Sequence, residues 1–379
     1  MTAPTVADVV RALGAAAPWG QAAEWDRVGL HVGDPAAEVS GVLVALDATP
    51  GVVDEAVERG CNVLVTHHPL LFKPVGRVTA DDPVGGLVLT MARAGVAHVA
   101  AHTNLDAAAD GVSVALAEQL GLTDVEVLAP LADAMRLVTT YVPSTHADAV
   151  RDALTAAGAG RIGKYDAVSF SSEGTGRFTP GPGARPAIGA VGEAEATPEV
   201  RAEAVVPSWY LQDAITAVKE AHPYEEAVVF AAPVAGVVPR EGFGAVGTLP
   251  GAETLADFLG RVARALGTPA LRHTGDPARP VRRVAVCGGS GLSFLPDAVR
   301  AGADAFVTAD VTYHRWFEAL GPDGRPRLAL VDAGHYETEA VAEALLARVV
   351  GDAFPALPVH RARTRTSPVA VYVAGPGGR

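Results

Sequence analysis

The chain has 379 residues, of which 49% are hydrophobic, and its formal net charge is -13 at pH 7. This length allows two or three domains with apolar cores, and the acidic balance, without a stripe of Lys and Arg, argues against a nucleic-acid backbone as the main partner. No apolar run is long enough to cross a bilayer, no signal-peptide pattern opens the chain and two cysteines are too few for a disulfide framework, so we expect a globular cytoplasmic protein with no membrane partner.

The first part of the chain alternates predicted strands with predicted helices. Apolar residues at helical spacing follow Thr5, a typical N-cap, and predict a helix over 5–16. In the loop that follows, Trp25 is expected to fill a core edge and Asp26 to cap a turn. Strands are then expected at 41–46, 63–66 and 96–101, and helices at 50–59, 83–94 and 110–120. This order predicts a parallel sheet with right-handed crossovers.

Two adjacent histidines, His67 and His68, follow the apolar strand that ends at Thr66. In open α/β sheets, ligands bind at that end of a strand. Neighbouring residues of an extended strand point to opposite faces, so two metal ions side by side would each take one imidazole more easily than one ion would take both. The alternative interpretation is one core histidine and one exposed histidine.

The next strand also leads into groups that bind metals. The residues after 96–101 include His102 and Asp106. Two strands of one sheet that both end in such side chains are seldom an accident, so we expect both ends at one site. The alternative for Asp106 is the N-cap of a following turn.

The middle of the chain has a different character. Strands are expected at 135–143, 167–170, 202–207 and 227–231, helices at 146–157 and 208–221, and a Gly/Pro/Thr-rich, turn-like stretch at 174–186. The order β-α-β then β-α-β predicts an inserted ferredoxin-like α+β domain over residues 132–241.

The α/β rhythm resumes after the insert. Helices are expected at 254–266, at 294–301 and from 335 to about 350, and a further helix after the strand at 305–308 is expected to end at residue 320. Strands are expected at 281–287, 305–308, 328–331 and 369–373. The predicted fold class is therefore α/β, with residues 1–131 and 242–379 forming two similar halves of one metal-binding domain.

A third group of candidate ligands opens a helix after the strand at 328–331. His335 and Glu339 are four residues apart, so they share one helix face and lie close enough to bind one ion. Imidazole and carboxylate ligands suit Zn, Fe, Mn or Co, and a carboxylate can bridge two ions. A water held between such ions would lose its proton near neutral pH and attack an electrophile.

Other polar groups have weaker patterns. His102, together with Asp310 and His314, which are four residues apart, either lie beside the ligands or form ordinary pairs. The glycines of 288–291 are interpreted as a plain tight turn, and the segment 222–226 as a capped helix end rather than a second metal site. A nucleophilic serine is not supported, because no Gly-x-Ser-x-Gly elbow is present. We therefore assign no catalytic residue and no organic cofactor.

The combined motifs resemble those of the Nif-three-like dinuclear metal centre family, often catalogued as GTP cyclohydrolase 1 type 2 homologues. The resemblance rests on Trp25-Asp26-Arg27-Val28-Gly29-Leu30, Thr66-His67-His68-Pro69-Leu70, His102-Thr103-Asn104-Leu105-Asp106 and Gly334-His335-Tyr336-Glu337-Thr338-Glu339. The middle stretch is similar to the PII-like insert of the longer bacterial members through Gly163-Lys164-Tyr165-Asp166, Gly174-Thr175-Gly176-Arg177-Phe178 and His222-Pro223-Tyr224-Glu225-Glu226. Taken together, the resemblance to this family covers nearly the whole chain.

The resemblance implies two divalent ions per subunit. His68 and Asp106 would hold one ion, His67 and His335 would contribute to the other, and Glu339 would bridge them. It further implies a homohexamer and, as activity, hydrolytic opening of the guanine ring of GTP.

Two hypotheses follow from the sequence. The first is a metal-dependent hydrolase acting on a purine nucleotide or another small anionic substrate. The second is a non-catalytic metal-binding scaffold or regulatory assembly in which the PII-like insert senses a ligand or a partner. The scarcity of lysine and the lack of a strong phosphate-binding loop favour the second modestly.

Overall fold

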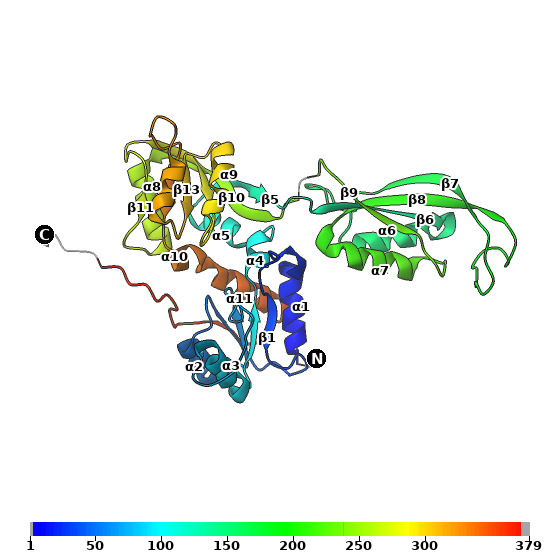
Figure 1. Ribbon diagram of the computed structural model, residues 1–379, viewed down its shortest axis with the longest axis horizontal. Helices are drawn as coiled ribbons and strands as arrows, with labels where there is room; N and C mark the ends of the chain where they lie inside the picture. Colours follow the sequence, from blue (N-terminus) through cyan, green and yellow to red (C-terminus); the bar gives the residue numbers. More distant parts are fainter. Residues whose placement is uncertain (1–2, 238, 373–379) are drawn as a thin grey trace, which may run out of the picture. The chain divides into compact units, whose positions relative to one another are not determined.

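The computed structural model describes residues 3–237 and 239–372 and divides into two compact units. One unit combines the chain up to Pro130 with the chain from Glu241 onward, and the other is Leu131–Arg240. Among the described residues, the strands form three sheets, two in the first unit and one in the second (Figure 1). The mixed α/β class expected from the sequence is confirmed.

The first sheet has the strand order β1-β4-β3-β2-β15. Strands β4, β3, β2 and β15 run parallel, and β1 pairs antiparallel with β4. Every residue of β2, β3 and β4 is buried, as expected for a parallel sheet covered on both faces. The strands are β1 (Gly29–Val32), β2 (Val42–Ala45), β3 (Val63–Thr66), β4 (Ala97–Ala100) and β15 (Val359–Arg361).

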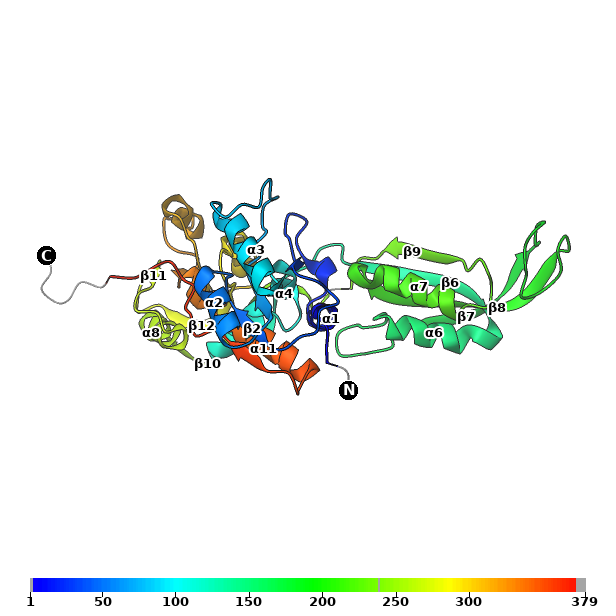
Figure 2. The same ribbon diagram turned by 90° about the horizontal axis from the view of Figure 1, so that it is seen from below.

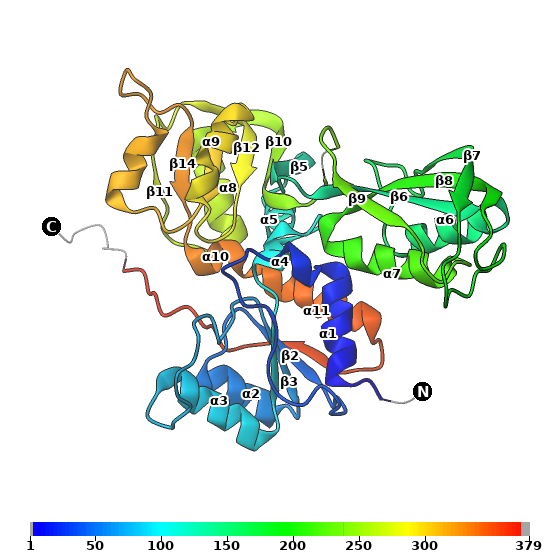
Figure 3. The same ribbon diagram turned by 45° about the vertical axis from the view of Figure 1, so that its right-hand side comes forward.

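Helices cover both faces of this sheet (Figure 3). On one side α1 (Val6–Ala16) and α11 (Val341–Ala353) enclose one apolar core, and on the other α2 (Pro50–Glu58) and α3 (Pro83–Ala94) enclose another. The predicted cap of α1 is confirmed, because the Thr5 hydroxyl accepts the Asp8 N–H and the Asp8 carboxylate accepts the Thr5 N–H.

The second sheet has the strand order β11-β14-β13-β12-β10-β5. Its strands β12, β13 and β14 are parallel, and β11, β10 and β5 join antiparallel at the edges. Helices α5 (Val112–Gln119) and α8 (Leu255–Leu266) pack on one face and α9 (Leu295–Arg300) on the other. The strands are β5 (Thr123–Pro130), β10 (Gly242–Thr254), β11 (Arg272–His273), β12 (Pro280–Val286), β13 (Ala305–Thr308) and β14 (Ala329–Asp332).

The second unit is built in the order β-α-β-β-α-β, which ferredoxin-like folds share. Its four antiparallel strands lie in the order β7-β8-β6-β9, and both helices pack on one face of this sheet (Figure 1). The β7–β8 hairpin extends beyond the other two strands (Figure 2). The elements are β6 (Met135–Pro143), α6 (Ala147–Ala156), β7 (Phe170–Phe178), β8 (Glu195–Pro207), α7 (Leu211–Ala221) and β9 (Val229–Pro233).

Several elements differ from the predicted ones. Strand β7 covers Phe170–Phe178, where a short strand and a turn are predicted, because its exposed, apolar-poor residues are held by pairing with β8 rather than by a buried face. Strands β1, β5, β10 and β11 are not predicted. The strand expected at 369–373 is wrong for its described residues, 369–372, and residue 373 lies outside the described residues; the last strand is instead β15.

None of the helices in the described part of the chain is both long and apolar enough to cross a membrane.

Candidate metal centre

The parallel strands of both sheets in the first unit end in polar side chains that converge on one place. Strand β3 ends at the His67–His68 pair, β4 runs into the short helix α4 (Thr103–Ala107), and β14 runs into the short helix α10 (His335–Glu339). These segments bring together the side chains that the sequence predicts as ligands, namely His67, His68, Asp106, His335 and Glu339.

His67 is fully buried, and its ring is oriented by the backbone. Its Nδ1 lies 2.9 Å from the Ala101 carbonyl and donates to it, so Nε2 is the nitrogen that faces the cluster. This Nε2 has no hydrogen-bond partner among the described residues, yet it faces Asp106 Oδ1 at 3.6 Å and Glu339 Oε1 at 3.9 Å. A buried imidazole nitrogen that has no hydrogen-bond partner and is aimed at two carboxylates fits a metal ligand.

Glu339 lies at the centre of the cluster and is buried. Its Oε2 is 2.9 Å from both His68 Nε2 and His335 Nε2, and these two nitrogens are 3.4 Å apart. Its Oε1 faces His67 instead. The two carboxylate oxygens therefore face different imidazoles, Oε1 that of His67 and Oε2 those of His68 and His335, as a bridging carboxylate would.

These distances divide the ligands differently from the pairing that the resemblance implies. His67 and Asp106 lie together on the Oε1 side of Glu339, and His68 and His335 lie together on the Oε2 side. The reason is geometric. His67 and His68 follow the end of β3, and their rings lie 5.2 Å apart and tilted by 42°, so each Nε2 meets a different neighbour.

The electrostatics of the cluster centre on Glu339. Burial opposes its ionisation, but the imidazoles of His335, His67 and His68 hold its pKa well below the usual range. Burial lowers the pKa of His68, yet Asp47 and Glu339 raise it to about 10. The hydrogen bond with Glu339, helped by Asp310 against the effect of burial, raises the pKa of His335 to about 9. Protons therefore occupy nitrogens that a cation would need, and binding must release them.

Two carboxylates orient the outer nitrogens of these imidazoles. Asp47 Oδ1 accepts from His68 Nδ1 at 2.7 Å, and Asp310 Oδ2 accepts from His335 Nδ1 at 2.7 Å. Such partners fix the ring so that Nε2 points to the centre. Asp310 thus lies beside the ligands, which is one of the two interpretations that the sequence left open for it. Asp47 was not predicted, although it is the second residue after β2, just as His68 is the second residue after β3.

His102 also reaches the cluster, and Asp26 holds it there. His102 offers a nitrogen within 4.8 Å of those of His67 and His68, and its Nδ1 donates to Asp26 at 3.0 Å. Asp26 is buried, and Thr103 also donates to it through its N–H and its hydroxyl. Asp26 therefore does more than cap a turn, because it also holds His102. Trp25 is exposed and does not fill a core edge. The sequence alone could not show this role of Asp26, because its partner His102 lies far along the chain.

The glycine turn after β12 is more than a tight turn. A Cβ on Gly289 would lie 2.0 Å from Glu339 Oε1 and 3.1 Å from His335 Nε2, and one on Gly288 would lie 3.2 Å from Glu339 Cγ. Gly289 also has φ +56, and its N–H donates to Thr338 Oγ1 at 3.0 Å. The two glycines let this backbone approach the central carboxylate.

His314 is placed elsewhere. It lies in the 3-10 segment Tyr313–Ala319, is exposed and packs against the Tyr313 ring, and no contact within the described residues joins it to the cluster. Of the two interpretations that the sequence left open for His314, a place beside the metal ligands is therefore not supported.

A pocket of about 410 Å³ opens beside the cluster. His68, His335, Asp47 and Asp310 line it, together with the guanidinium-bearing Arg272. The Arg272 side chain pairs with Asp332 and lies over the Trp316 ring, 5.6 Å from its centroid. A small molecule in this pocket would touch both the imidazoles and a fixed positive charge.

Two groups of nearby side chains have ligand atoms within 4.8 Å of one another, namely His67, His68 and His102, and His68, His335 and Glu339. Nitrogen and carboxylate donors of this kind suit divalent transition metals. The orphaned His67 Nε2 supports the same conclusion from geometry alone. The residues present therefore fit a bound metal ion.

Comparisons with known proteins agree with this description. A sequence model of the family Duf34/NIF3 (NGG1p interacting factor 3) matches residues 4–368. Proteins named GTP cyclohydrolase 1 type 2 homolog are similar to the chain, with 40% identity over 327 residues in Bacillus subtilis (86% of this chain, 87% of the relative). In Mycobacterium tuberculosis the identity is 43% over 341 residues, 88% of each chain.

Solved structures show the same similarity. The crystal structure of a Bacillus cereus protein related to NIF3 matches with a TM-score of 0.85 and 36% identity, covering 98% of this chain and 100% of that one. A Staphylococcus aureus protein matches with a TM-score of 0.76 and 30% identity over the same shares. The chain belongs to the Duf34/NIF3 family.

Proposed function

We propose that the cluster holds two divalent metal ions and that the protein is a metal-dependent hydrolase. The observation that carries this proposal is the division of the ligands around Glu339. His67 and Asp106 would hold one ion with Oε1, and His68 and His335 the other with Oε2. Bound ions of this kind supply Lewis acidity and make water nucleophilic near neutral pH. Zn, Fe, Mn and Co all suit these donors.

The substrate class is the finer part of the proposal. Relatives carry the name GTP cyclohydrolase 1 type 2 homolog, so we propose a purine nucleotide, attacked by water at an electron-poor ring carbon. The pocket of about 410 Å³ beside His68 and His335 has room for a small ligand, and Arg272 offers a guanidinium to an anionic group.

The chain's own residues have separate tasks in this reaction. Asp47 and Asp310 keep the Nδ1 hydrogens of His68 and His335, so both Nε2 atoms stay aimed at the centre. Asp26 keeps the Nδ1 hydrogen of His102, which orients this ring beside His67 and His68.

The test is a screen of the metal-loaded protein against GTP and related nucleotides, followed by mass spectrometry. We expect a product with the mass of substrate plus water, or of that species after loss of formate. A chelator and Glu339→Gln should abolish turnover, and Glu118→Gln, an exposed change of the same kind on α5, should not. Full metal occupancy without turnover on any nucleotide would contradict the hydrolase.

The second candidate is a metal-binding scaffold or regulatory assembly in which the insert is a sensor. It is favoured by the separate compact unit Leu131–Arg240, whose β-α-β-β-α-β order is compatible with a PII-like domain. We propose the domain boundaries 1–131, 132–241 and 242–379, together with a homohexamer in the cytoplasm. Metal content and the mass of the assembly, measured on the full chain and after deletion of 134–238, test these statements.

A further inference from the structure

The insert motifs that the metal centre does not use line one cavity. This cavity has a volume of about 710 Å³ and lies within the unit Leu131–Arg240. Tyr141 and Arg201 are opposite each other in the β6–β8 pairing and line it, whereas the next residues, Val142 and Ala202, are buried. Neighbouring strand residues point to opposite faces, so the cavity lies on the sheet face away from α6 and α7. The motif residues that line it are Gly174, Gly176, Phe178, Tyr224, Glu225 and Glu226.

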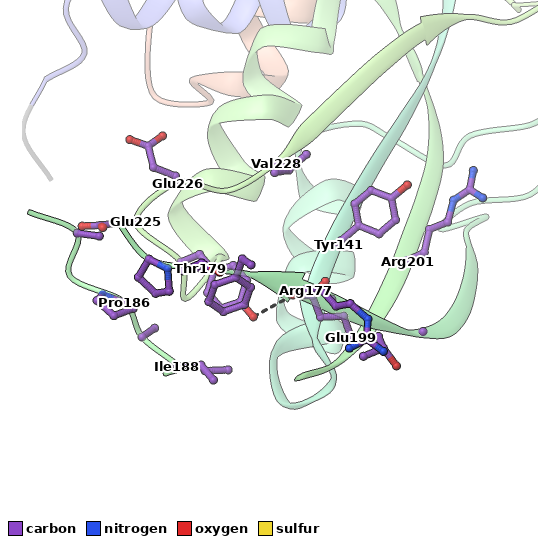
Figure 4. A pocket seen from close by; sticks show the side chains of 18 of the residues that line it. Tyr141, Arg177, Thr179, Pro186, Ile188, Glu199, Arg201, Glu225, Glu226 and Val228 are labelled. Carbon is purple, nitrogen blue, oxygen red and sulfur yellow. Dashed lines mark hydrogen bonds between the residues drawn. The ribbon is translucent and has the colours of Figure 1, made fainter. Parts of the chain in front are cut away.

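A buried carboxylate faces this cavity without a cationic partner. Glu199 lines the cavity and is only 9% exposed (Figure 4). The Tyr224 hydroxyl donates to its Oε1 at 2.9 Å, drawn as a dashed line in Figure 4. No ion pair joins it to a Lys, Arg or His in the described part of the chain. A buried carboxylate with one neutral donor keeps unused capacity to accept hydrogen bonds.

The surroundings hold this carboxylate in place. A Cβ on Gly176 would lie 2.2 Å from Glu199 Cδ, so the glycine leaves the room that the carboxylate fills. His222 donates through Nε2 to the Tyr141 carbonyl at 2.9 Å and accepts the Tyr224 N–H through Nδ1 at 3.1 Å. The Tyr224 ring packs against His222 and Phe178, with centroids 4.9 Å and 5.5 Å away. The site is therefore built before any ligand arrives.

Charge and shape indicate what would bind. Glu173 and Glu226 line the cavity with Glu199, together with a Glu225 that is paired with Arg185. Arg177 and an Arg201 that is already paired with Glu203 are the cationic side chains of the lining. The walls also carry aromatic and aliphatic side chains, which suit an apolar ring and a cation above an aromatic face.

We propose that this cavity binds a small organic cation, an amidine, guanidine or amine joined to an apolar body, with its N–H groups on Glu199. The site goes beyond the proposed hydrolase and shares no residue with the metal centre. It names a class of ligand for the insert if the protein is a regulatory assembly. Its test does not depend on whether the protein turns over a nucleotide.

The experiment compares three ring compounds of nearly one shape with the full-length protein by calorimetric titration and ligand-observed NMR. Benzamidine is cationic, benzamide is neutral and benzoate is anionic. We expect saturable binding of benzamidine about tenfold or more tighter than that of benzamide, and no binding of benzoate, because a charge-assisted hydrogen bond distinguishes them. The same result is expected with and without a chelator, because no metal ligand takes part.

Two variants separate this site from general binding. Glu199→Gln keeps an acceptor for Tyr224 but removes the charge, and should weaken benzamidine about tenfold or more. Glu220→Gln makes the same change at an exposed position on α7 and should leave binding unchanged. Should Glu199→Gln fail to fold, Ile188→Trp, which fills the cavity from a loop, should abolish binding.

Three results would overturn the proposal. They are no saturable benzamidine binding, equal binding by Glu199→Gln or Ile188→Trp, and tighter binding of benzoate or of a nucleotide such as ATP.

Discussion

His67 Nε2 faces Asp106 Oδ1 across 3.6 Å, and that nitrogen is buried with no hydrogen-bond partner among the described residues. The distance is too long for a hydrogen bond and short enough for both atoms to bind one cation. The relationship joins the ends of two adjacent parallel strands, β3 and β4.

Metal binding should therefore stabilise the protein through this pair. Zn²⁺ at about one hundred times its Kd should add about 2.7 kcal/mol to the free energy of unfolding, if the unfolded chain does not bind it. His67→Gln should lose most of that gain, and His314→Gln, a histidine outside the cluster, should keep it. Thermal unfolding with and without a chelator measures both. An equal gain in the two variants would place the ion elsewhere.

Metal binding should also release protons. The pKa values of about 10 for His68 and about 9 for His335 mean that both are protonated near pH 7 without metal. Against the effect of burial, Asp106 and Glu339 also raise the pKa of His67. Because ligation needs neutral imidazoles, at least about two protons should leave on binding at pH 7, and metal affinity should fall as the pH falls. Titration calorimetry in buffers of different ionisation enthalpy counts these protons.

The same pKa values set the pH dependence of the metal-free protein. A folded-state pKa raised above the usual value of 6.5 gives stability that is complete below about pH 6.5 and disappears as the pH rises through about 9 to 10. Denaturant unfolding in the presence of a chelator should thus show declining stability between pH 7 and 10. His68→Gln should flatten this decline, and a decline of equal size in that variant would assign it to other groups.

Asp26→Asn should loosen the orientation of His102 with little loss of fold. The amide keeps an acceptor for Thr103 but no longer holds the His102 Nδ1 hydrogen with a charge. Loss of such a partner typically lowers metal affinity or activity by about 10-fold to 100-fold. Metal titration of this variant beside Asp352→Asn, an exposed change on α11, measures the effect. Unchanged affinity and turnover would make Asp26 a structural residue alone.

Gly289→Ala should disrupt the centre through steric contact. Its Cβ would meet Glu339 Oε1 at 2.0 Å, and its φ of +56 adds a backbone penalty of about 1–2 kcal/mol. Gly267→Ala is the matched control, because Gly267 has φ +65 and nothing within 4 Å of the added Cβ. Both variants should lose the backbone penalty, Gly289→Ala should lose more because of the contact with Glu339, and Gly289→Ala alone should lose metal. Retained metal in Gly289→Ala would show that the turn can move away.

The sequence by itself determined the elements whose signals are local. Apolar runs predicted β2, β3, β4, β13 and β14, which are buried along their whole length. Helical spacing after the Thr5 cap predicted α1, and the helices predicted at 50–59 and 83–94 correspond to α2 and α3. The rule that ligands gather at strand ends found the predicted cluster, because the carboxyl ends of parallel strands meet along one edge.

Tertiary structure alone decided what depends on a distant partner. Strand β7 has no apolar face and exists through its pairing with β8. Asp26 acts through His102, and the close approach of Gly289 is set by Glu339, which follows a different strand. The division of the ligands about Glu339 depends on which way His67 and His68 point once three strands and two sheets have assembled. Spacing along a chain fixes which groups share a face, but only packing fixes what stands opposite them.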